Sequence, residues 1–135
     1  PPPPHTPSSL SSAASDVYKR QMQDILVATQ DFDVVVGADQ SMQGAELALQ
    51  DAGLLDEVKI VGFGGTAYAV DAVKDGRWWG DLFGVPATEG RLAMEALVEA
   101  LDGNALGGID PALSVTDEGL MTAENVDQFT AEWES

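Results

Sequence analysis

The stretch VVVGADQSMQGAELALQDAG, residues 34–53, decides the fold. It opens with consecutive valines at 34–36, a run that fits a strand buried on both faces of a parallel sheet. Gly37 and Ala38 end this strand. In open α/β sheets ligands bind at the carboxyl ends of the strands. The loop after residue 36 is therefore the first candidate for a binding site.

A helix follows the strand. Asp39 or Ser41 can accept hydrogen bonds from the free N–H groups at its start. One apolar face is formed at helical spacing by Ala45, Ala48, Leu49 and Ala52. Gly53 stands where a left-handed residue ends a helix. Residues 34–53 thus predict one strand–loop–helix unit.

The same pattern recurs twice along the chain. We predict strands at 58–63 and 78–83, with Thr66 capping the helix after the first of them. A short helix at 22–29 precedes the repeats. Alternating units of this kind predict the α/β class, with a parallel sheet and helices on both faces. Three strands make a thin sheet, which suggests a piece of a larger protein.

Two further helices are expected near the end. The longest follows Pro86, ends at Gly103 and carries a predicted buried stripe of Ala93, Ala96, Leu97, Ala100 and Leu101. Residues 113–116 are expected to be extended. Thr122 then caps a last helix with a predicted buried face of Val126, Phe129 and Trp133.

Composition narrows the classes of function. The 135 residues suffice for one domain, and they include 23 acidic and 6 basic side chains but no cysteine. A formal charge of −17 opposes binding to nucleic acid and to anionic membranes. No apolar run reaches the length of a membrane span. We therefore expect neither nucleic acid as a partner nor membrane insertion.

The amino-terminal residues have a different character. Residues 1–15 are rich in Pro, Ser and Ala, which predicts disorder, and no signal peptide is readable. The run SSAASDVYKRQ, residues 11–21, looks like translated adapter sequence. We therefore divide the chain into a disordered, non-native tail at 1–21 and an α/β domain at 22–135. The only histidine, His5, lies in this tail.

Several motifs resemble one family in order and spacing. They are ADQSMQGAELALQDAG (38–53), VKIVGFGGT (58–66), VDAVKDGRW (70–78), VPATEGRLAMEAL (85–97) and VTDEGLMTAENVDQF (115–129). Together they resemble the C-terminal part of type 1 periplasmic binding proteins, the sugar- and ribose-binding-like receptors of bacterial ABC transporters. The resemblance implies two α/β lobes that close on a small ligand, with only the C-terminal lobe at 22–135 in this chain.

The resemblance places the ligand-binding, cleft-lining positions at Ala38, Asp39, Gly64 and Gly84. The family's Asn–Asp pair is Ala38-Asp39 here, so its amide is missing. The family's Phe-Asp-Gly-Thr segment has Gly64 in place of Asp, and Gly84 or Val85 replaces a Gln. Each unpaired sugar hydroxyl costs about 1–3 kcal/mol. We therefore expect a larger or less polar ligand, or one held mostly by the other lobe, and backbone N–H groups exposed at these small residues.

The resemblance implies a non-catalytic solute-binding component of an ABC transporter, for a sugar or a sugar-like ligand. Its partners would be that small molecule and an ABC permease, its location periplasmic or extracellular, and it would need no cofactor. A lactose-repressor-type regulator is the nearest alternative, because it shares this core. The ending VTDEGLMTAENVDQF, residues 115–129, favours the exported receptor.

A second alternative is a small nucleotide-binding enzyme. GFGGTA, residues 62–67, matches a loose dinucleotide fingerprint, with Asp81 downstream. Gly62 should however lie inside the strand rather than in the turn. No nucleophile elbow or metal-binding spacing is present, so we predict no catalytic and no metal-ligating residues. Trp78 and Trp79 are expected to pack structurally, at the end of their strand opposite the cleft.

Overall fold

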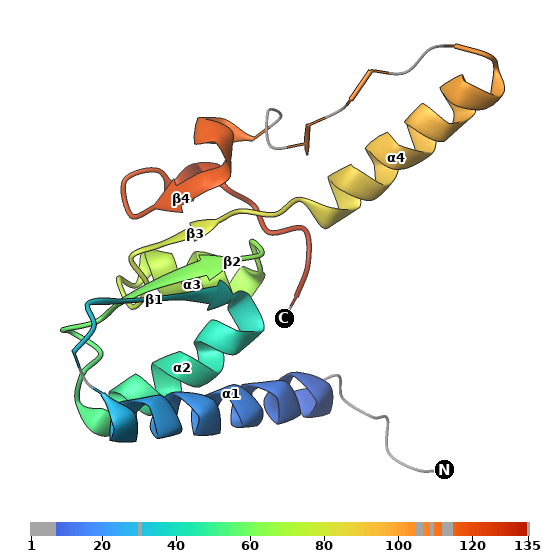
Figure 1. Cartoon of the computed structure of the whole chain (residues 1–135). Coiled ribbons are helices and arrows are strands. Elements are labelled where there is room, and N and C mark those ends of the chain that lie inside the picture. The colour runs from blue at the N-terminus through green and yellow to red at the C-terminus, as the bar shows by residue number, and fades with distance from the viewer. Residues whose placement is uncertain (1–7, 30, 105–106, 109, 112–114, 135) are drawn as a thin grey trace, which may run out of the picture.

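A computed structural model describes residues 8–29, 31–104, 107–108, 110–111 and 115–134. Its helices and strands follow one another along the chain as shown in Figure 1. They are α1 (Ser8–Ala28), β1 (Val34–Ala38), α2 (Asp39–Ala52), β2 (Lys59–Phe63), α3 (Ala67–Lys74), β3 (Gly80–Leu82), α4 (Pro86–Leu101) and β4 (Leu120–Thr122).

The strands form one sheet in the order β1-β2-β3-β4. The first three strands are parallel, and β4 pairs antiparallel with β3. The predicted α/β class is confirmed, and the predicted parallel pairing holds for β1, β2 and β3, whereas the antiparallel edge strand β4 was not predicted. Two predicted helix boundaries are also confirmed: Gly53 is left-handed at the end of α2, and the Thr66 hydroxyl accepts a hydrogen bond from Ala69 N at 3.1 Å.

The sheet has one covered and one open face. Ile60, Asp81 and Met121 point to the covered face and are fully buried. The opposite face exposes apolar side chains, namely Val34, Val36, Phe63, Leu82 and Leu120. The prediction that residues 34–36 are buried on both faces is wrong, because Val36 is 68% exposed.

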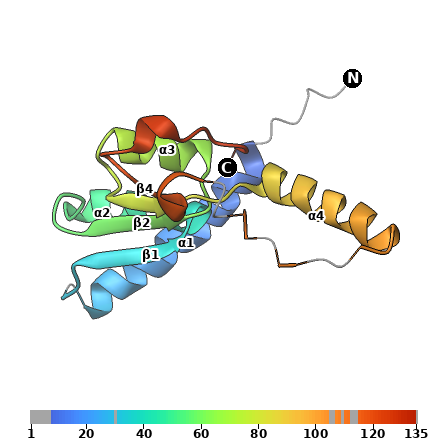
Figure 2. The same ribbon diagram turned by 90° about the horizontal axis from the view of Figure 1, so that it is seen from above.

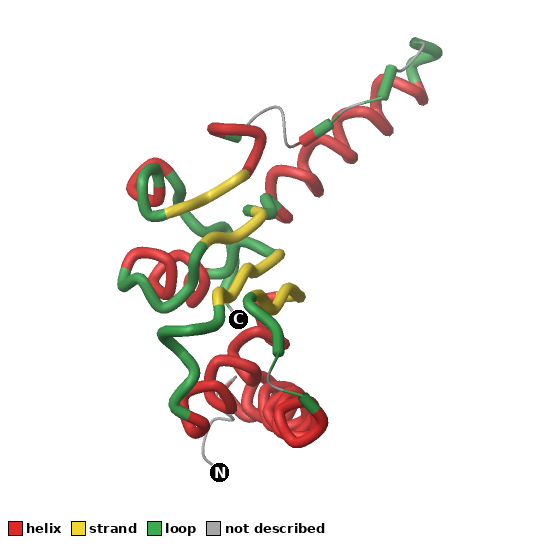
Figure 3. The backbone as a smooth tube through the Cα atoms, turned by 60° about the vertical axis from the view of Figure 1, so that its left-hand side comes forward, coloured by secondary structure: helices red, strands yellow, loops and turns green. Residues whose placement is uncertain are grey.

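The connections explain this asymmetry. β1, β2 and β3 are neighbours in sequence order, so right-handed crossovers place α2 and α3 on the same face. Figure 3, which views the sheet nearly end-on, shows both helices on one side of it. We expected helices on both faces; among the described residues they cover only one.

Helix α1 adds a third layer beneath α2 (Figure 1). The two backbones touch at Gly44, where an added Cβ would lie 2.7 Å from Lys19 N. Lys19 also pairs with Asp51 at 2.7 Å, and Met22 and Leu26 are buried. The prediction of disorder is therefore wrong for residues 8–21, and residues 1–7 lie outside the described residues. The boundary expected at residue 22 falls inside α1, because contact with small residues of α2 stabilises a Ser- and Ala-rich segment as helix.

Helix α4 projects away from the sheet, as Figures 1 and 2 show. Its predicted buried stripe is wrong: none of its residues is buried, and Leu97 and Leu101 are 51% and 78% exposed. Apolar periodicity identified the helix and its apolar face, but it says nothing about what that face packs against.

The predicted last helix is also wrong. Thr122 ends strand β4, and a single 3₁₀ turn spans Val126–Gln128. Val126 and Phe129 are buried as predicted, whereas Trp133 is 37% exposed. Residues 113 and 114 of the predicted extended piece lie outside the described residues. None of the described helices combines the length and apolar character needed to span a lipid bilayer.

Candidate functional site

The carboxyl ends of β1, β2 and β3 meet at one edge of the sheet. Ala38 is exposed at the end of β1, and Gly64 and Gly84 follow β2 and β3 and are partly exposed. The backbones after β2 and β3 approach closely, since a Cβ on Gly65 would lie 2.7 Å from Gly84 N. The structure thus brings three of the four predicted positions to one accessible edge.

Asp39, the fourth position, is fully buried. Its Oδ2 accepts a hydrogen bond from Thr66 N at 2.8 Å, so it fastens the start of α2 to the turn after β2. The predicted capping of its own helix is wrong, because the N-cap residue of α2 is Ala38 and no side-chain bond caps that end. Asp39 therefore links the ends of β1 and β2 from the buried side of the sheet edge.

Asp81 is a second buried carboxyl group beneath the same turn. Its Oδ1 accepts a hydrogen bond from Gly65 N at 3.0 Å. Burial first, and then the adjacent carboxyl of Asp39, together raise the pKa of Asp81 to about 8. Sequence reasoning connected Asp81 only with a nucleotide, because nothing local in the sequence places it opposite Asp39.

The backbone amides of this turn are already engaged. Gly64 N donates to Leu82 O at 3.1 Å, and Ala67 N donates to Trp133 O at 3.2 Å. Since Gly65 N and Thr66 N bind the two aspartates, four consecutive amides have partners inside the molecule. The expectation of exposed N–H groups at these small residues is therefore wrong for the turn after β2.

Trp133 is the second residue at this edge that sequence reasoning misplaced. Its Nε1 donates a hydrogen bond to Gly64 O at 2.9 Å, and its ring would lie 3.3 Å from a Cβ on Gly64. The periodicity of residues 126–133 suggested a buried helix stripe, which hid this contact. A half-exposed indole beside Gly64 offers a flat apolar surface to a ligand.

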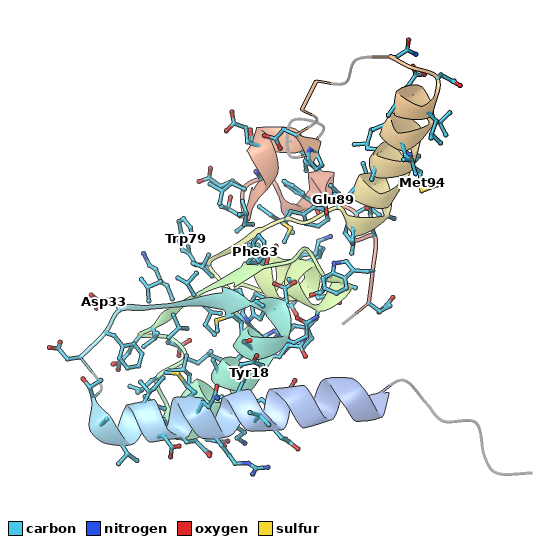
Figure 4. All side chains as sticks on the ribbon, turned by 45° about the vertical axis from the view of Figure 1, so that its right-hand side comes forward. Tyr18, Asp33, Phe63, Trp79, Glu89 and Met94 are labelled. Carbon is cyan, nitrogen blue, oxygen red and sulfur yellow. The ribbon has the colours of Figure 1, made fainter. Side chains whose placement is uncertain are left out.

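An open hollow of about 260 Å³ lies at the same end of β2 and β3. It is lined by Phe63, Leu82, Phe83, Gly84, Val85, Glu89, Asp110, Pro111 and Glu118. Phe63 on β2 and Glu89 on α4, which flank it, are labelled in Figure 4. Gly84 thus belongs both to the predicted cleft residues and to this hollow.

Trp78 and Trp79 lie at the opposite, amino-terminal end of β3. Trp78 is buried against the ring of Tyr68, and its Nε1 donates to Glu46 Oε2 at 2.7 Å. Burial and the Glu46 carboxylate raise the pKa of Tyr68. Trp79 is half-exposed with the Lys59 ammonium over its ring. Neither indole reaches the candidate cleft.

The geometry does not favour a nucleotide site. Gly62 lies inside β2, as expected, and Asp81 is buried beneath the turn rather than free to bind a ribose. The amides that would cradle a phosphate are the ones engaged by Asp39, Asp81 and Trp133. Among the described residues no group of three or more His, Cys, Asp or Glu side chains could hold a metal ion.

Several solved structures that this chain resembles are solute-binding proteins of ABC transporters. The chain matches an ABC transporter periplasmic solute-binding protein from Actinobacillus succinogenes with bound D-allose, at a TM-score of 0.73 and 19% identity over 85% of this chain. A Bacillus halodurans solute-binding protein with bound myo-inositol matches at a TM-score of 0.67 and 28% identity over 84% of this chain. The periplasmic binding protein component of the arabinose ABC transporter from Shewanella sp. ANA-3 matches at a TM-score of 0.68 and 25% identity over 84% of this chain.

The match covers only part of these relatives, namely 39%, 38% and 38% of their own chains. No curated protein is significantly similar to this chain in sequence. The family model for the periplasmic binding protein domain matches residues 12–105, which is more than half of the chain. The chain therefore belongs to the periplasmic binding protein domain family.

Proposed function

We propose that this chain is part of the solute-binding component of a bacterial ABC transporter, for a sugar or a sugar-like ligand. In this proposal residues 22–135 belong to the C-terminal lobe, and α1 extends that lobe toward the amino terminus. The observation that carries the proposal is the fold match, over 84% of the chain and at 28% identity, to a solute-binding protein with bound myo-inositol.

The accessible carboxyl edge supports this proposal. Ala38, Gly64 and Gly84 would line the cleft, with Asp39 acting from beneath through Thr66 N. The half-exposed Trp133 ring adds an apolar surface of the kind that sugar rings contact. The missing amide and carboxylate side chains at positions 38, 64 and 84 leave most polar contacts to the other lobe.

Unpartnered apolar surface supports the presence of further structure in the intact protein. The open sheet face exposes Val36, Phe63 and Leu82, and α4 exposes Leu97 and Leu101. Surfaces of this kind mark contacts with other parts of a protein. Because the chain spans 38% or 39% of its relatives, we assign these surfaces to contacts within a two-lobed protein.

The mechanism in this proposal is binding without chemistry. The ligand enters between two lobes, contacts to both lobes favour hinge closure, and the closed form docks on the permease. A periplasmic or cell-surface location follows from this role. No cofactor and no catalytic residue take part.

The test is ligand binding by the full gene product, with D-allose, L-arabinose and myo-inositol as probes. We expect calorimetric binding of at least one probe and a change in tryptophan fluorescence. The change should be lost in Trp133→Phe and retained in Trp79→Phe, because Trp79 lies at the other end of the sheet. No binding of any probe, together with specific retention of duplex DNA, would instead support the repressor-type alternative.

A further inference from the structure

Two carboxyl oxygens beneath the cleft turn are buried without a hydrogen-bond partner. They are Asp39 Oδ1 and Asp81 Oδ2. The second oxygen of each group is bound, to Thr66 N and Gly65 N respectively. A buried, unpaired carboxylate oxygen costs free energy, so the two open positions require a common explanation.

Both open oxygens converge on Gly62. A Cβ at this position would lie 2.8 Å from Asp39 Oδ1 and would collide with Asp81 Oδ2. Gly62 is the central residue between the two, because β2 lies between β1 and β3 and Gly62 pairs with Asp81. The absence of a side chain at Gly62 creates the space in which the carboxyl groups meet.

No described cation compensates this pair of acids. On α2, Glu46 is engaged with Trp78 and Arg77. Lys74 of α3 pairs with Asp127, Lys59 of β2 lies over the ring of Trp79, and Glu132 of the carboxyl-terminal segment accepts a hydrogen bond from Thr88 N. Two oxygens also fall short of the six or more that a Mg²⁺ or Ca²⁺ ion takes. A proton is the smallest cation that satisfies both oxygens at once.

We propose that Asp39 and Asp81 share one proton, and that this protonated pair positions residues 63–66 at the carboxyl edge of the sheet. Asp81 carries the proton and donates it in a hydrogen bond to Asp39 Oδ1. Both carboxyl groups then use both of their oxygens, and the ends of β1 and β3 are tied across Gly62. That the positioned turn lines a ligand cleft rests on the proposed function; the shared proton does not.

The sign of the pH dependence follows from the direction of the shift. Burial and the Asp39 carboxyl raise the pKa of Asp81 from 3.8 to about 8, so between these values the folded chain retains a proton that the unfolded chain has lost. The stabilisation that comes from the retained proton of Asp81 is fully present below about pH 3.8 and is lost as the pH rises toward about 8. One retained proton changes the folding constant by about tenfold for each pH unit.

The experiment compares the full 135-residue chain with Asp81→Asn by urea unfolding at several pH values. The amide keeps an acceptor for Gly65 N and a donor for Asp39, but it does not titrate. We expect the folding constant of Asp81→Asn to rise relative to the unsubstituted chain, by about tenfold per pH unit from about pH 5.5 to about pH 7.5. Asp56→Asn, an exposed change of the same charge, should leave the profile unchanged.

Two readouts on the unsubstituted chain keep the test decisive if Asp81→Asn does not fold. Infrared spectra should show the C=O stretch of a protonated carboxyl group at neutral pH, lost on titration through about pH 8. Trp133 fluorescence should change over the same range, because the indole binds Gly64 O. The shared proton would be overturned if the stability of Asp81→Asn and of the unsubstituted chain changed with pH in the same way, or if the infrared band were absent. Stabilisation by Mg²⁺ or Ca²⁺ that requires Asp81 would also overturn it. A band without a fluorescence change would overturn only the positioning of the turn.

Discussion

The indole N–H of Trp78 donates a hydrogen bond to Glu46 Oε2 at 2.7 Å, joining α2 to the start of β3. Arg77 Nη1 binds the other oxygen of the same carboxylate at 2.6 Å, and Tyr68 completes the cluster at 3.0 Å. Glu46 is buried, so its carboxylate depends on these three donors for the hydrogen bonds it lost from water.

Replacing Glu46 tests this cluster. We expect Glu46→Ala to lower the free energy of unfolding by about 3 kcal/mol, because it leaves the Trp78 N–H and the Arg77 charge without their partner. Glu46→Gln should cost less, since the amide oxygen still accepts one bond. Glu95→Ala, which breaks an exposed pair with Arg91, should change stability by less than about 0.5 kcal/mol. Urea unfolding measures all three variants.

Gly62→Ala should destabilise the chain, whereas Gly90→Ala should not. At Gly62 the new methyl group would collide with Asp81 Oδ2 and lie 2.5 Å from the Trp78 ring, so we expect a loss of about 2–3 kcal/mol. Gly90 lies in α4 with no neighbour within 4 Å. Alanine there should favour the helix by about 0.5–1 kcal/mol. Losses of equal size in thermal unfolding would contradict the crowding at Gly62.

Restoring the family's carboxylate at position 64 should fail in this chain. Gly64 has a φ of 154°, and a Cβ there would lie 2.9 Å from Asp39 Oδ2 and 3.3 Å from Trp133. We expect Gly64→Asp to destabilise by about 2 kcal/mol or more, through backbone strain and carboxylate repulsion. Ala38→Asp adds the same charge at an exposed position and should cost less than about 1 kcal/mol. A stable Gly64→Asp variant that binds sugars would disprove this crowding.

The exposure of α4 leads to an unusual expectation for its leucines. Leu97→Asp should change the stability of the 135-residue chain by less than about 0.5 kcal/mol and should reduce self-association, because the side chain is 51% exposed. Leu49→Ala, at a fully buried position of α2, should cost about 2–5 kcal/mol. Sedimentation and urea unfolding report the two properties separately. A large loss for Leu97→Asp would mean that α4 packs against the chain in solution.

Local sequence signals predicted β1 to β3 and the helices α2, α3 and α4, but neither strand β4 nor what each element packs against. The Val-rich strand start, Thr66 as a cap and Gly53 as a stop each act within a few residues, and all three are present. The packing of α1 against Gly44 and the solvent exposure of α4 depend on segments distant in the sequence. The periodicity within one helix therefore could not reveal them. A buried stripe and an exposed apolar stripe have the same spacing in a sequence.

The location of the candidate site could be predicted from the sequence, but the contacts of its side chains could not. Ala38, Gly64 and Gly84 lie at the edge where parallel strands end, as the strand–loop–helix pattern indicates. Asp81 is one of 23 acidic residues, and its burial opposite Asp39 depends on strand order and on Gly62. Trp133 reaches Gly64 across 69 residues of sequence, a separation over which no local pattern carries information.

The engaged amides of the turn after β2 have a consequence for the ligands of the proposed solute-binding protein. Gly65 N and Thr66 N already bind carboxyl groups, and the chain carries a formal charge of −17. A phosphorylated or acidic sugar would meet neither a free donor at this turn nor a favourable long-range field. In the proposed function we therefore expect binding to favour uncharged sugars over their phosphate esters and uronic acids.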